Sequence, residues 1–441
     1  MNAWIAIVSV LAVLLASISL LRWYQISQKP HPEIVRKLLH VIMGSVTITF
    51  PWVFHETWPV WLLALVSACT LGAIKYQPRL KESVGSVVCA VERRTYGEIC
   101  FPLAVAILFS VAHTQPLLYC VPMAILSIAD ASSALVGMFY GKHKYSTSEG
   151  NKTAEGSLTF FAIASLATLV PLLAMGVGIE RAALISLLLG CLVTLFEAIA
   201  WQGLDNLFIP LSAYAMLLTG LTTSIGMLAE QLGVACLLLL VAILLRGRTK
   251  LNDSAALGAA LFCYLSWAIG GWMWSIAPLT VLAAHRLILP AKYRRQDARP
   301  HTIHEVIWVA SAGFFWLWLS KTTAQSFLLP YTLTYAAQLA LIGCAHATMP
   351  QAQSLKTNAA VQSCFVAWSA LFLPFALTTG FSPEAVAFSF CSLLAMLICA
   401  AAFLALHRGE ANQFHSVTRW AQQTGVVAAC SAAVFVILQL T

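Results

Sequence analysis

The sequence predicts an all-α polytopic membrane protein, and both its composition and the spacing of its apolar stretches indicate this fold class. Hydrophobic residues make up 60% of the 441 positions, whereas charged residues make up only 10%. Apolar stretches of roughly 17–22 residues recur along the chain, and each is long enough to cross a bilayer as a helix. A soluble domain would need more charged surface, so we expect an integral, multi-pass membrane protein.

We predict about sixteen transmembrane helices, and we expect the first of them to be retained rather than cleaved. No basic residue precedes Ala3, whereas Arg22 directly follows this first stretch. A cleaved signal peptide carries its positive charge in front of the apolar segment, which is not the pattern here. The approximate cores are 3–21, 38–54, 58–74, 99–114, 118–140, 157–178, 181–200, 207–224, 229–245, 254–270, 272–289, 303–320, 329–348, 359–380, 385–406 and 422–440.

The loops between these stretches differ in charge, and the difference predicts the topology. Basic residues concentrate in alternate loops, whereas the opposite loops carry few charges. The basic loops are 22–37, 75–98, 141–156, 246–253, 286–300 and 407–420. By the positive-inside rule they lie in the cytoplasm, which places both termini on the non-cytoplasmic side. Topology therefore explains the net charge of +8, and no basic stripe with interleaved aromatic residues indicates a nucleic-acid partner.

Residues suited to chemistry concentrate in the first part of the chain. We therefore predict a membrane domain with a catalytic site over 1–245 and a second membrane domain, without an assigned role, over 246–441. In the second part, small residues at helical spacing around Gly258 are explained by helix packing. The 12 cysteines are scattered and include no Cys-x-x-Cys pair, so we interpret them as small apolar residues rather than disulfides or zinc ligands.

Asp130 is the most informative single residue, because it lies within an apolar stretch of a chain that contains only four aspartates. It precedes Gly141 by about 11 residues, so a straight helix would place it about 15 Å below the loop. A structural alternative is a packing residue bonded to Ser132, Ser133 or a neighbouring helix. The functional interpretation is a carboxylate in a water-filled cleft that holds Mg²⁺ on a triphosphate or accepts a proton from an alcohol.

Gly137 and Gly141 share a helix face, and Lys142 follows them directly. A close helix–helix contact explains these glycines nearly as well as the approach of a phosphate does. The segment is not a P-loop, because its spacing is one residue short and His143 stands where Ser or Thr should follow.

The segment Lys152–Ser157 directly precedes the sixth apolar stretch. Thr153 or Ser157 could simply cap that helix. Alternatively, the N–H groups around Gly156 and the positive helix end would receive a phosphate, with Lys152 adding charge. Glu155 would then complete a metal site.

Two further acids follow in the chain. Glu197 lies near the cytoplasmic end of the seventh stretch, and Asp205 lies within Trp201–Asn206. Glu197 is close enough to the interface to extend into water, and Asp205 could cap the next helix. Together with Asp130, these acids could converge on one metal–nucleotide complex.

Arg36, Lys37 and His40 lie at the start of the second stretch, where Arg36 and His40 share a helix face. Their alternative role is ordinary loop-flanking charge. The polar segments 31–40, 93–98, 141–157 and 201–206 all fall on the predicted cytoplasmic side, where nucleotides are found.

Five motifs occur in a fixed order along about residues 30–225. They are Arg36-Lys37-x-x-His40, Arg94-Thr-Tyr96-Gly97-Glu98, Asp130 with Gly137, Gly141 and Lys142, Lys152-Thr153-x-Glu155-Gly156-Ser157, and Glu197 with Asp205-Asn206. This set resembles the membrane-embedded polyprenol kinase family of dolichol, phytol and farnesol kinases. That family is related to membrane phosphatidate cytidylyltransferases that use CTP.

The resemblance implies phosphoryl transfer from CTP, or from ATP in its place, to an isoprenoid alcohol such as phytol, farnesol, geranylgeraniol or dolichol. It implies that Asp130 and Glu155 act as metal-binding or catalytic carboxylates, with Mg²⁺ inferred as the ion. The implied phosphate-binding residues are Gly137, Gly141, Lys142, Lys152, Thr153, Gly156 and Ser157. Glu197, Asp205 and Asn206 would close the site, and Arg36, Lys37 and His40, together with Asn206, would line the substrate entrance. The segment Ser146–Asn151 departs from the family pattern, which leaves the roles of the two lysines open.

Two other function classes remain open at this stage. A phospholipid cytidylyltransferase would share the metal and CTP chemistry but form a different product. A transporter would explain many spans with polar residues, although no repeat relates the two halves and the charges gather at one face. The expected partners are the alcohol, the nucleotide and the lipid bilayer, and an oligomer is compatible with the sequence.

Overall fold

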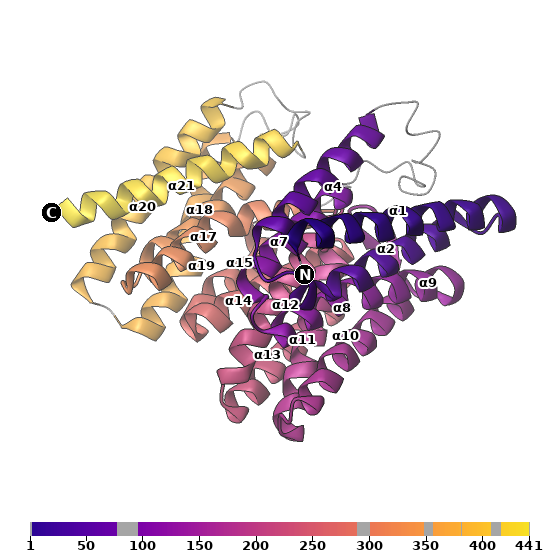
Figure 1. Cartoon of the computed structure of the whole chain (residues 1–441). Coiled ribbons are helices and arrows are strands. Elements are labelled where there is room, and N and C mark those ends of the chain that lie inside the picture. Colours follow the sequence, from indigo (N-terminus) through magenta and orange to yellow (C-terminus); the bar gives the residue numbers. More distant parts are fainter. Residues whose placement is uncertain are drawn as a thin grey trace. The chain divides into compact units, whose positions relative to one another are not determined.

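The computed structural model describes residues 2–76, 96–288, 300–347, 356–380, 382–406 and 416–440. The chain forms two compact units, Met1–Leu237 and Leu238–Thr441. Nearly all the described regular structure is helical (Figure 1). The all-α prediction is therefore confirmed, apart from one short β-hairpin.

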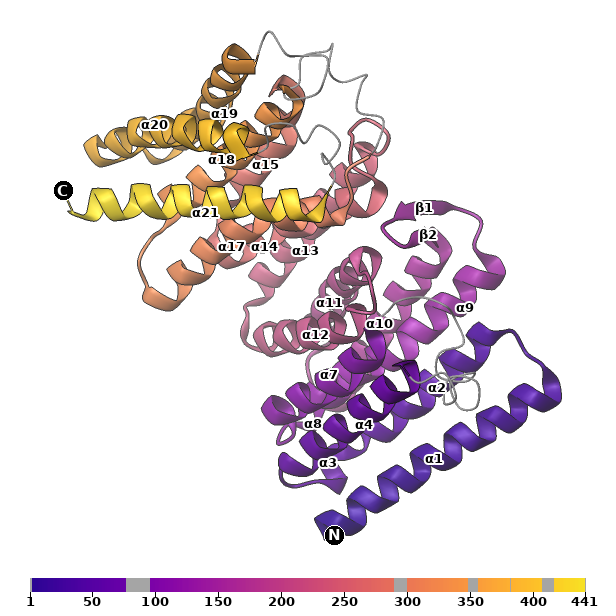
Figure 2. The ribbon, with the colours of Figure 1, turned by 90° about the horizontal axis from the view of Figure 1, so that it is seen from above.

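The first unit consists of helices that cover most of its length and the hairpin between two of them. Its elements are α1 (Ala3–Gln28), α2 (Pro32–Ile48), α3 (Phe50–Val53), α4 (Trp58–Tyr76), α7 (Gly97–Ala112), α8 (Pro116–Ala124), the π-helix η1 (Ile125–Ala129), α9 (Asp130–Tyr140), β1 (Lys144–Thr147), β2 (Gly150–Thr153), α10 (Ala154–Ala174), α11 (Ile179–Ile199), α12 (Asp205–Thr222) and α13 (Ile225–Leu244). α13 continues past the unit boundary. Helix α10 packs against both α9 and α11 (Figure 2), and α2 packs against α8, η1 and α9.

Large apolar side chains cover the outside of these helices. On α1, for example, Val8, Leu15 and Trp23 are each more than 60% exposed. A soluble protein does not leave such a surface uncovered, whereas lipid tails solvate it. Twelve described helices are long enough and apolar enough to cross a membrane, and the chain is an integral multi-pass membrane protein.

Every predicted apolar stretch coincides with a helical segment, including shorter apolar helices such as Trp58–Ala73 and Ile99–Ala112. The total of sixteen crossings and the side on which the termini lie stay predictions.

The helix containing Asp130 has an irregularity that the apolar pattern did not reveal. A π-turn, η1, joins α8 to α9 without a loop. Opposite it, an added Cβ at Gly44 would lie 1.7 Å from Ser127 Oγ, so α2 approaches η1 this closely only because residue 44 has no side chain. Near the end of α2, the hydroxyl of Tyr119 on α8 donates a hydrogen bond to the Thr47 carbonyl (3.0 Å). The glycine and the tyrosine therefore fix α2 directly against the π-turn.

The described part of the second unit contains seven further helices and the end of α13. The seven are α14 (Asp253–Gly270), α15 (Trp272–Ile288), α17 (Ile303–Thr323), α18 (Leu328–Ala347), α19 (Lys356–Thr379), α20 (Pro383–Leu406) and α21 (Val417–Leu440). Helix α18 is the central element, because it contacts α15, α17, α19, α20 and α21. In its core the Tyr331 hydroxyl donates to the Trp274 carbonyl (2.8 Å).

Candidate active site

A buried ion pair joins two helices in the first unit. Lys37 on α2 lies 2.7 Å from a carboxylate oxygen of Asp130, the first residue of α9. Both side chains are almost completely shielded from solvent. His40, one turn further along α2, lies 3.7 Å from the same Asp130 oxygen. The structure therefore brings together three residues that the sequence separates by about 90 positions.

The π-turn explains how His40 reaches this position. The His40 Nε2–H donates to the backbone carbonyl of Leu126 (3.1 Å) within η1. In a π-turn the i→i−4 ladder is interrupted, so a carbonyl becomes available to an outside donor. The ring also packs edge-on against Phe101 (5.2 Å between centroids). π-turns are frequent at functional sites, and this one lies immediately before Asp130.

A second ion pair joins the hairpin to α11. Lys152, on β2, lies 2.7 Å from Glu197 Oε1 and also donates to the Glu197 backbone carbonyl. Burial alone would lower the pKa of Lys152, but the Glu197 carboxylate outweighs it and raises the pKa above its ordinary value. Lys152 therefore stays positively charged at neutral pH. The second carboxylate oxygen of Glu197, Oε2, is buried and has no hydrogen-bond partner among the described residues.

The hairpin itself is what positions Lys152. Its antiparallel register pairs Tyr145 with Lys152, and Gly150 at the turn has a φ of +122°, which favours glycine. The Tyr145 hydroxyl lies 2.8 Å from Ser157 Oγ on α10. Glu149 at the tip accepts a hydrogen bond from the backbone N–H of Gln202. The segment 146–151, which departs from the family pattern, thus forms the turn and the adjoining strand ends of a hairpin that is anchored at its base and at its tip.

Asp205, the first residue of α12, lies near both ion pairs. The charges of Asp130, Lys152 and Lys37 all act on it, and its own charge acts on His40. Its Oδ1 accepts the Asn206 N–H (3.1 Å). No ion pair within 4 Å engages Asp205 among the described residues. The cluster formed by Lys37, His40, Asp130, Lys152, Glu197 and Asp205 is called the buried charge cluster below.

Asn206 holds a neighbouring loop rather than contacting this cluster. Its Nδ2 donates to the Gly97 carbonyl (3.1 Å), and the Tyr96 N–H donates to the Gln202 carbonyl (2.6 Å). Gly203, with a φ of +80°, packs directly on Gly97. The second family motif therefore meets the fifth in space, although Arg93 and Arg94 lie outside the described residues.

Glu155 lies in the first turn of α10 and is engaged by His143. Its carboxylate accepts the His143 backbone N–H (3.2 Å) and contacts His143 Nδ1 (2.6 Å). No contact joins it to Asp130 in the part of the chain that the structure describes. Thr153 caps α10 by accepting the Gly156 N–H (3.2 Å), so the capping alternative is confirmed for this residue.

The three glycines of the motifs lie where α9 packs against the start of α10. An added Cβ at Gly156 would lie 2.9 Å from the Ser133 carbonyl oxygen, and one at Gly137 would lie 2.9 Å from Thr153 Oγ1. At Gly141 it would lie 2.5 Å from the Thr153 methyl group. Close packing therefore accounts for these glycines, as the structural alternative expected. A phosphate-binding role for them stays a prediction.

Two basic residues lie apart from the buried charge cluster. Lys142 is exposed, and no hydrogen bond or ion pair joins its side chain to the cluster among the described residues. Arg36 is 44% exposed and pairs with Glu33 (2.8 Å) on the same helix face. Lys37, grouped with Arg36 in the predicted entrance, instead lies inside the cluster.

The described residues contain no group of three or more His, Cys, Asp and Glu side chains arranged to hold a metal ion. Mg²⁺ in nucleotide sites commonly takes only one or two carboxylates and completes its shell with phosphates and water. Asp130 and Asp205 fit that smaller requirement, because two nearby carboxylates repel each other and a cation would relieve the repulsion. Glu155, held by His143, does not join them.

Comparison with known proteins supports the family resemblance. No protein-family model matches the chain, and no solved structure matches it. The phytol kinase of Synechocystis sp. is 28% identical over 189 residues, which cover 41% of this chain and 76% of that protein. The resemblance to the polyprenol kinases is thus confirmed over a segment of the chain.

Proposed function

We propose that the first unit of this chain is an isoprenoid alcohol kinase, which transfers the terminal phosphoryl group of a nucleoside triphosphate to the alcohol at the cytoplasmic membrane face. The observation that carries the proposal is the buried charge cluster within an otherwise apolar helical unit. Ionisable groups at membrane depth are costly and are retained for function. The phytol kinase relative supports the class of alcohol, and the choice of CTP rests on the family resemblance.

Asp205 is the proposed acceptor of the alcohol proton. Asp130 is engaged by Lys37 at 2.7 Å and is therefore a weaker base, whereas no cationic side chain lies within 4 Å of the Asp205 carboxylate in the described part of the chain. As the alcohol oxygen bonds to the γ-phosphorus, its proton passes to the Asp205 carboxylate. The bond from the γ-phosphorus to the β,γ-bridging oxygen breaks, and the nucleoside diphosphate leaves with that oxygen.

Lys152 and Lys37 are the proposed phosphate-binding cations. Phosphoryl transfer requires mainly alignment and neutralisation of charge on the phosphate oxygens. Each lysine is held by a carboxylate, Lys152 by Glu197 and Lys37 by Asp130, so neither must be reorganised when the nucleotide binds. His40, anchored to Leu126, keeps the Asp130 side of the cluster in place.

Asp130 is the residue that would hold Mg²⁺, since a nucleotide site needs only one or two carboxylates and Asp205 is assigned to the alcohol proton. The ion would supply charge neutralisation on the phosphate oxygens during transfer. The remaining requirement, access for a water-insoluble alcohol, is met by apolar surface beside the cluster. Phe139 at the end of α9 and Leu158 at the start of α10 are each at least 60% exposed, so an isoprenoid tail can remain in lipid while its hydroxyl reaches the cluster.

The test is to incubate membranes containing the full chain with Mg²⁺, an isoprenoid alcohol, and CTP labelled at the γ- or the α-phosphorus. Phytol, farnesol, geranylgeraniol and dolichol are compared, and ATP replaces CTP in a parallel series. The proposal expects label from the γ-position in a prenyl monophosphate and none from the α-position. Lipid labelled from the α-position would instead indicate a cytidylyltransferase. Absence of lipid label with every alcohol and both nucleotides, in well-expressed protein, would refute the kinase.

A further inference from the structure

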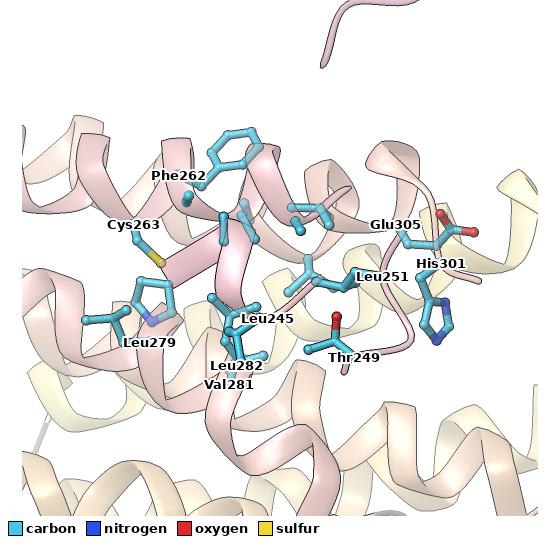
Figure 3. Close-up of a pocket in the computed structure, with 18 of the residues that line it drawn as sticks. Leu245, Thr249, Leu251, Phe262, Cys263, Leu279, Val281, Leu282, His301 and Glu305 are labelled. Carbon is cyan, nitrogen blue, oxygen red and sulfur yellow. The ribbon is translucent and has the colours of Figure 1, made fainter. Parts of the chain in front are cut away.

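The second unit contains a partly open cavity of about 480 Å³ among α13, α14, α15, α17, α18 and α21. This volume lies in the range of small-molecule binding sites. Most of the lining is apolar, but the polar groups are not spread evenly. Figure 3 shows Phe262, Cys263 and Leu279 at one end, whereas Thr249, His301 and Glu305 lie at the other.

A short parallel bridge builds the polar end. Leu251 pairs with His301, whose N–H donates to the Lys250 carbonyl (2.7 Å), and the Asn252 N–H donates to the His301 carbonyl (2.9 Å). The bridge fixes the segment that carries Arg248 and Lys250, both of which line the cavity. The positive-inside rule accounts for basic residues in this loop, but not for their position at one end of a mostly apolar cavity.

The same cavity is lined by a buried donor without an acceptor. Trp420 is 3% exposed, and its indole N–H has no hydrogen-bond partner among the described residues. Thr249 Oγ1 is likewise buried without a partner. The Arg419 guanidinium lies 5.0 Å from the centre of the Trp420 ring and adds positive charge nearby. Buried polar groups are normally satisfied, so these atoms call for an acceptor-rich ligand.

Glu305 contributes the negative charge at this end, but that charge is engaged elsewhere. One Glu305 oxygen accepts the Thr302 N–H (2.7 Å) and the Thr302 hydroxyl (2.5 Å) in a capping box at the start of α17. Arg248 and Lys250 line the same end, so two basic side chains stand there beside one acidic side chain. The polar end therefore offers more positive charge and hydrogen-bond donors than acceptors.

We infer that this cavity binds a single-chain lipid with a phosphate monoester head. The apolar end accommodates the hydrocarbon chain of the lipid. Arg248, Lys250 and the Trp420 N–H donate hydrogen bonds to the phosphate oxygens. Such a lipid has two sources: an isoprenyl monophosphate or a one-chain glycerol phosphate. The inference concerns the second unit alone and holds whether or not the first unit is a kinase.

Native mass spectrometry of the purified full chain in detergent tests this inference. The probes are geranylgeranyl monophosphate, oleoyl lysophosphatidic acid and the uncharged geranylgeraniol. Arg248→Gln is expected to weaken monophosphate binding about tenfold, as loss of one charge-assisted contact does. Lys321→Gln removes the same charge from the exposed far end of α17 and should leave binding unchanged. Ala259→Phe, which fills the apolar end, should weaken all three probes.

Tight binding of either monophosphate that depends on Arg248 supports the inference, and the probe that binds identifies the source of the lipid. Equal affinity for geranylgeraniol and its monophosphate would overturn it. Monophosphate binding that neither Arg248→Gln nor Ala259→Phe weakens would also overturn the inference, because the lipid would then bind elsewhere in the protein. No binding of any probe to well-folded protein would also overturn it.

Discussion

Both units bury polar side chains between helices, but they bury different kinds. In the first unit, opposite charges from distant segments meet: Lys37 with Asp130 and Lys152 with Glu197. In the second, the main buried network is made of amides and hydroxyls. There the Gln423 amide donates to Gln338 Oε1 (2.7 Å), and Gln338 donates to Thr424 Oγ1 (3.2 Å).

The two buried charged side chains described in the second unit, Glu305 and Arg419, also contact neutral polar groups. Arg419 donates to the amide oxygen of Gln423 (3.2 Å) and lies over the Phe403 ring (5.6 Å to its centre). The ion pair described in the second unit, between Arg246 and Asp253, lies near the surface. Neutral networks of this kind fix helix positions when each member is satisfied.

The difference teaches what the charges in the first unit are for. A buried ion pair contributes little net stability, because desolvation offsets the attraction between its members. Amide networks fix the helices of the second unit without that cost, so ion pairs are not needed to assemble helices in this chain. The charges of the first unit are better explained by chemistry, and five experiments can break or sharpen this comparison.

Asp130→Asn is expected to have the largest effect. Phosphoryl transfer should fall by about a hundredfold to a thousandfold, as for loss of a group that stabilises charge in the transition state. The variant also leaves Lys37 buried without a counter-charge, which by itself destabilises a protein by about 3–5 kcal/mol. Initial rates with labelled CTP and thermal unfolding in detergent measure the two effects.

The double variant Lys37→Met with Asp130→Leu separates those effects. Removing both charges leaves no uncompensated ion, so its stability should be close to that of the natural chain. It should nevertheless be inactive. An active double variant would show that the pair serves only helix packing, and the contrast between the units would disappear.

Lys152→Met should have the next largest effect, and Lys142→Met is its matched control. Both lysines were predicted to bind phosphate, but only Lys152 joins the buried charge cluster. Loss of one charge-assisted contact to a phosphate should raise the KM for the nucleotide by roughly 10- to 100-fold. The exposed Lys142 should give less than about a threefold change. Steady-state kinetics at varied CTP concentration measure the KM of both variants. A larger increase in KM for Lys142→Met than for Lys152→Met would indicate that the phosphate binds at the Gly141–Lys142 turn.

The helices could be predicted from the sequence, because an apolar stretch long enough to cross a membrane is easily recognised in the sequence alone. Motif residues such as Asp130, Lys152, Glu197 and Asp205 were also identifiable, since charge is rare in these stretches. Two partnerships were not predicted. Lys37 with Asp130 and Lys152 with Glu197 each depend on how helices far apart in the sequence pack, and hydropathy carries no information about pairing between distant segments.

Two local features were also missed, for a different reason. The π-turn Ile125–Ala129 has the composition of any apolar helix, and its one extra residue per turn leaves no sequence signal. The hairpin Lys144–Thr153 is short and polar, so it was treated as a loop. A signal was nevertheless available, because Tyr145, Thr147 and Thr153 favour strands and Gly150 favours a turn.

Gly156→Ala should have a moderate effect, and it acts on packing rather than chemistry. The added Cβ would lie 2.9 Å from the Ser133 carbonyl oxygen, so α10 must shift from α9 at a cost of about 1–3 kcal/mol. Gly233→Ala is the control, because no atom lies within 4 Å of its added Cβ, and it should be neutral or slightly stabilising. Thermal unfolding of both variants tests the packing account. A Gly156→Ala variant of full stability that cannot bind nucleotide would instead assign this glycine to phosphate binding.

Gln423→Leu should have the smallest effect on activity, although it disrupts the main network of the second unit. It removes one hydrogen-bond partner from each of Gln338 and Arg419, and the two lost hydrogen bonds should cost about 1–3 kcal/mol of unfolding free energy. Gln422→Leu, at the exposed neighbouring position, should cost less than about 0.5 kcal/mol. Phosphoryl transfer should stay within about twofold for both variants, because a residue outside the reacting groups changes rate only through stability or coupling. A large loss of transfer in stable Gln423→Leu protein would mean that the second unit takes part in the reaction, and the division between a unit that reacts and a unit that does not would have to be abandoned.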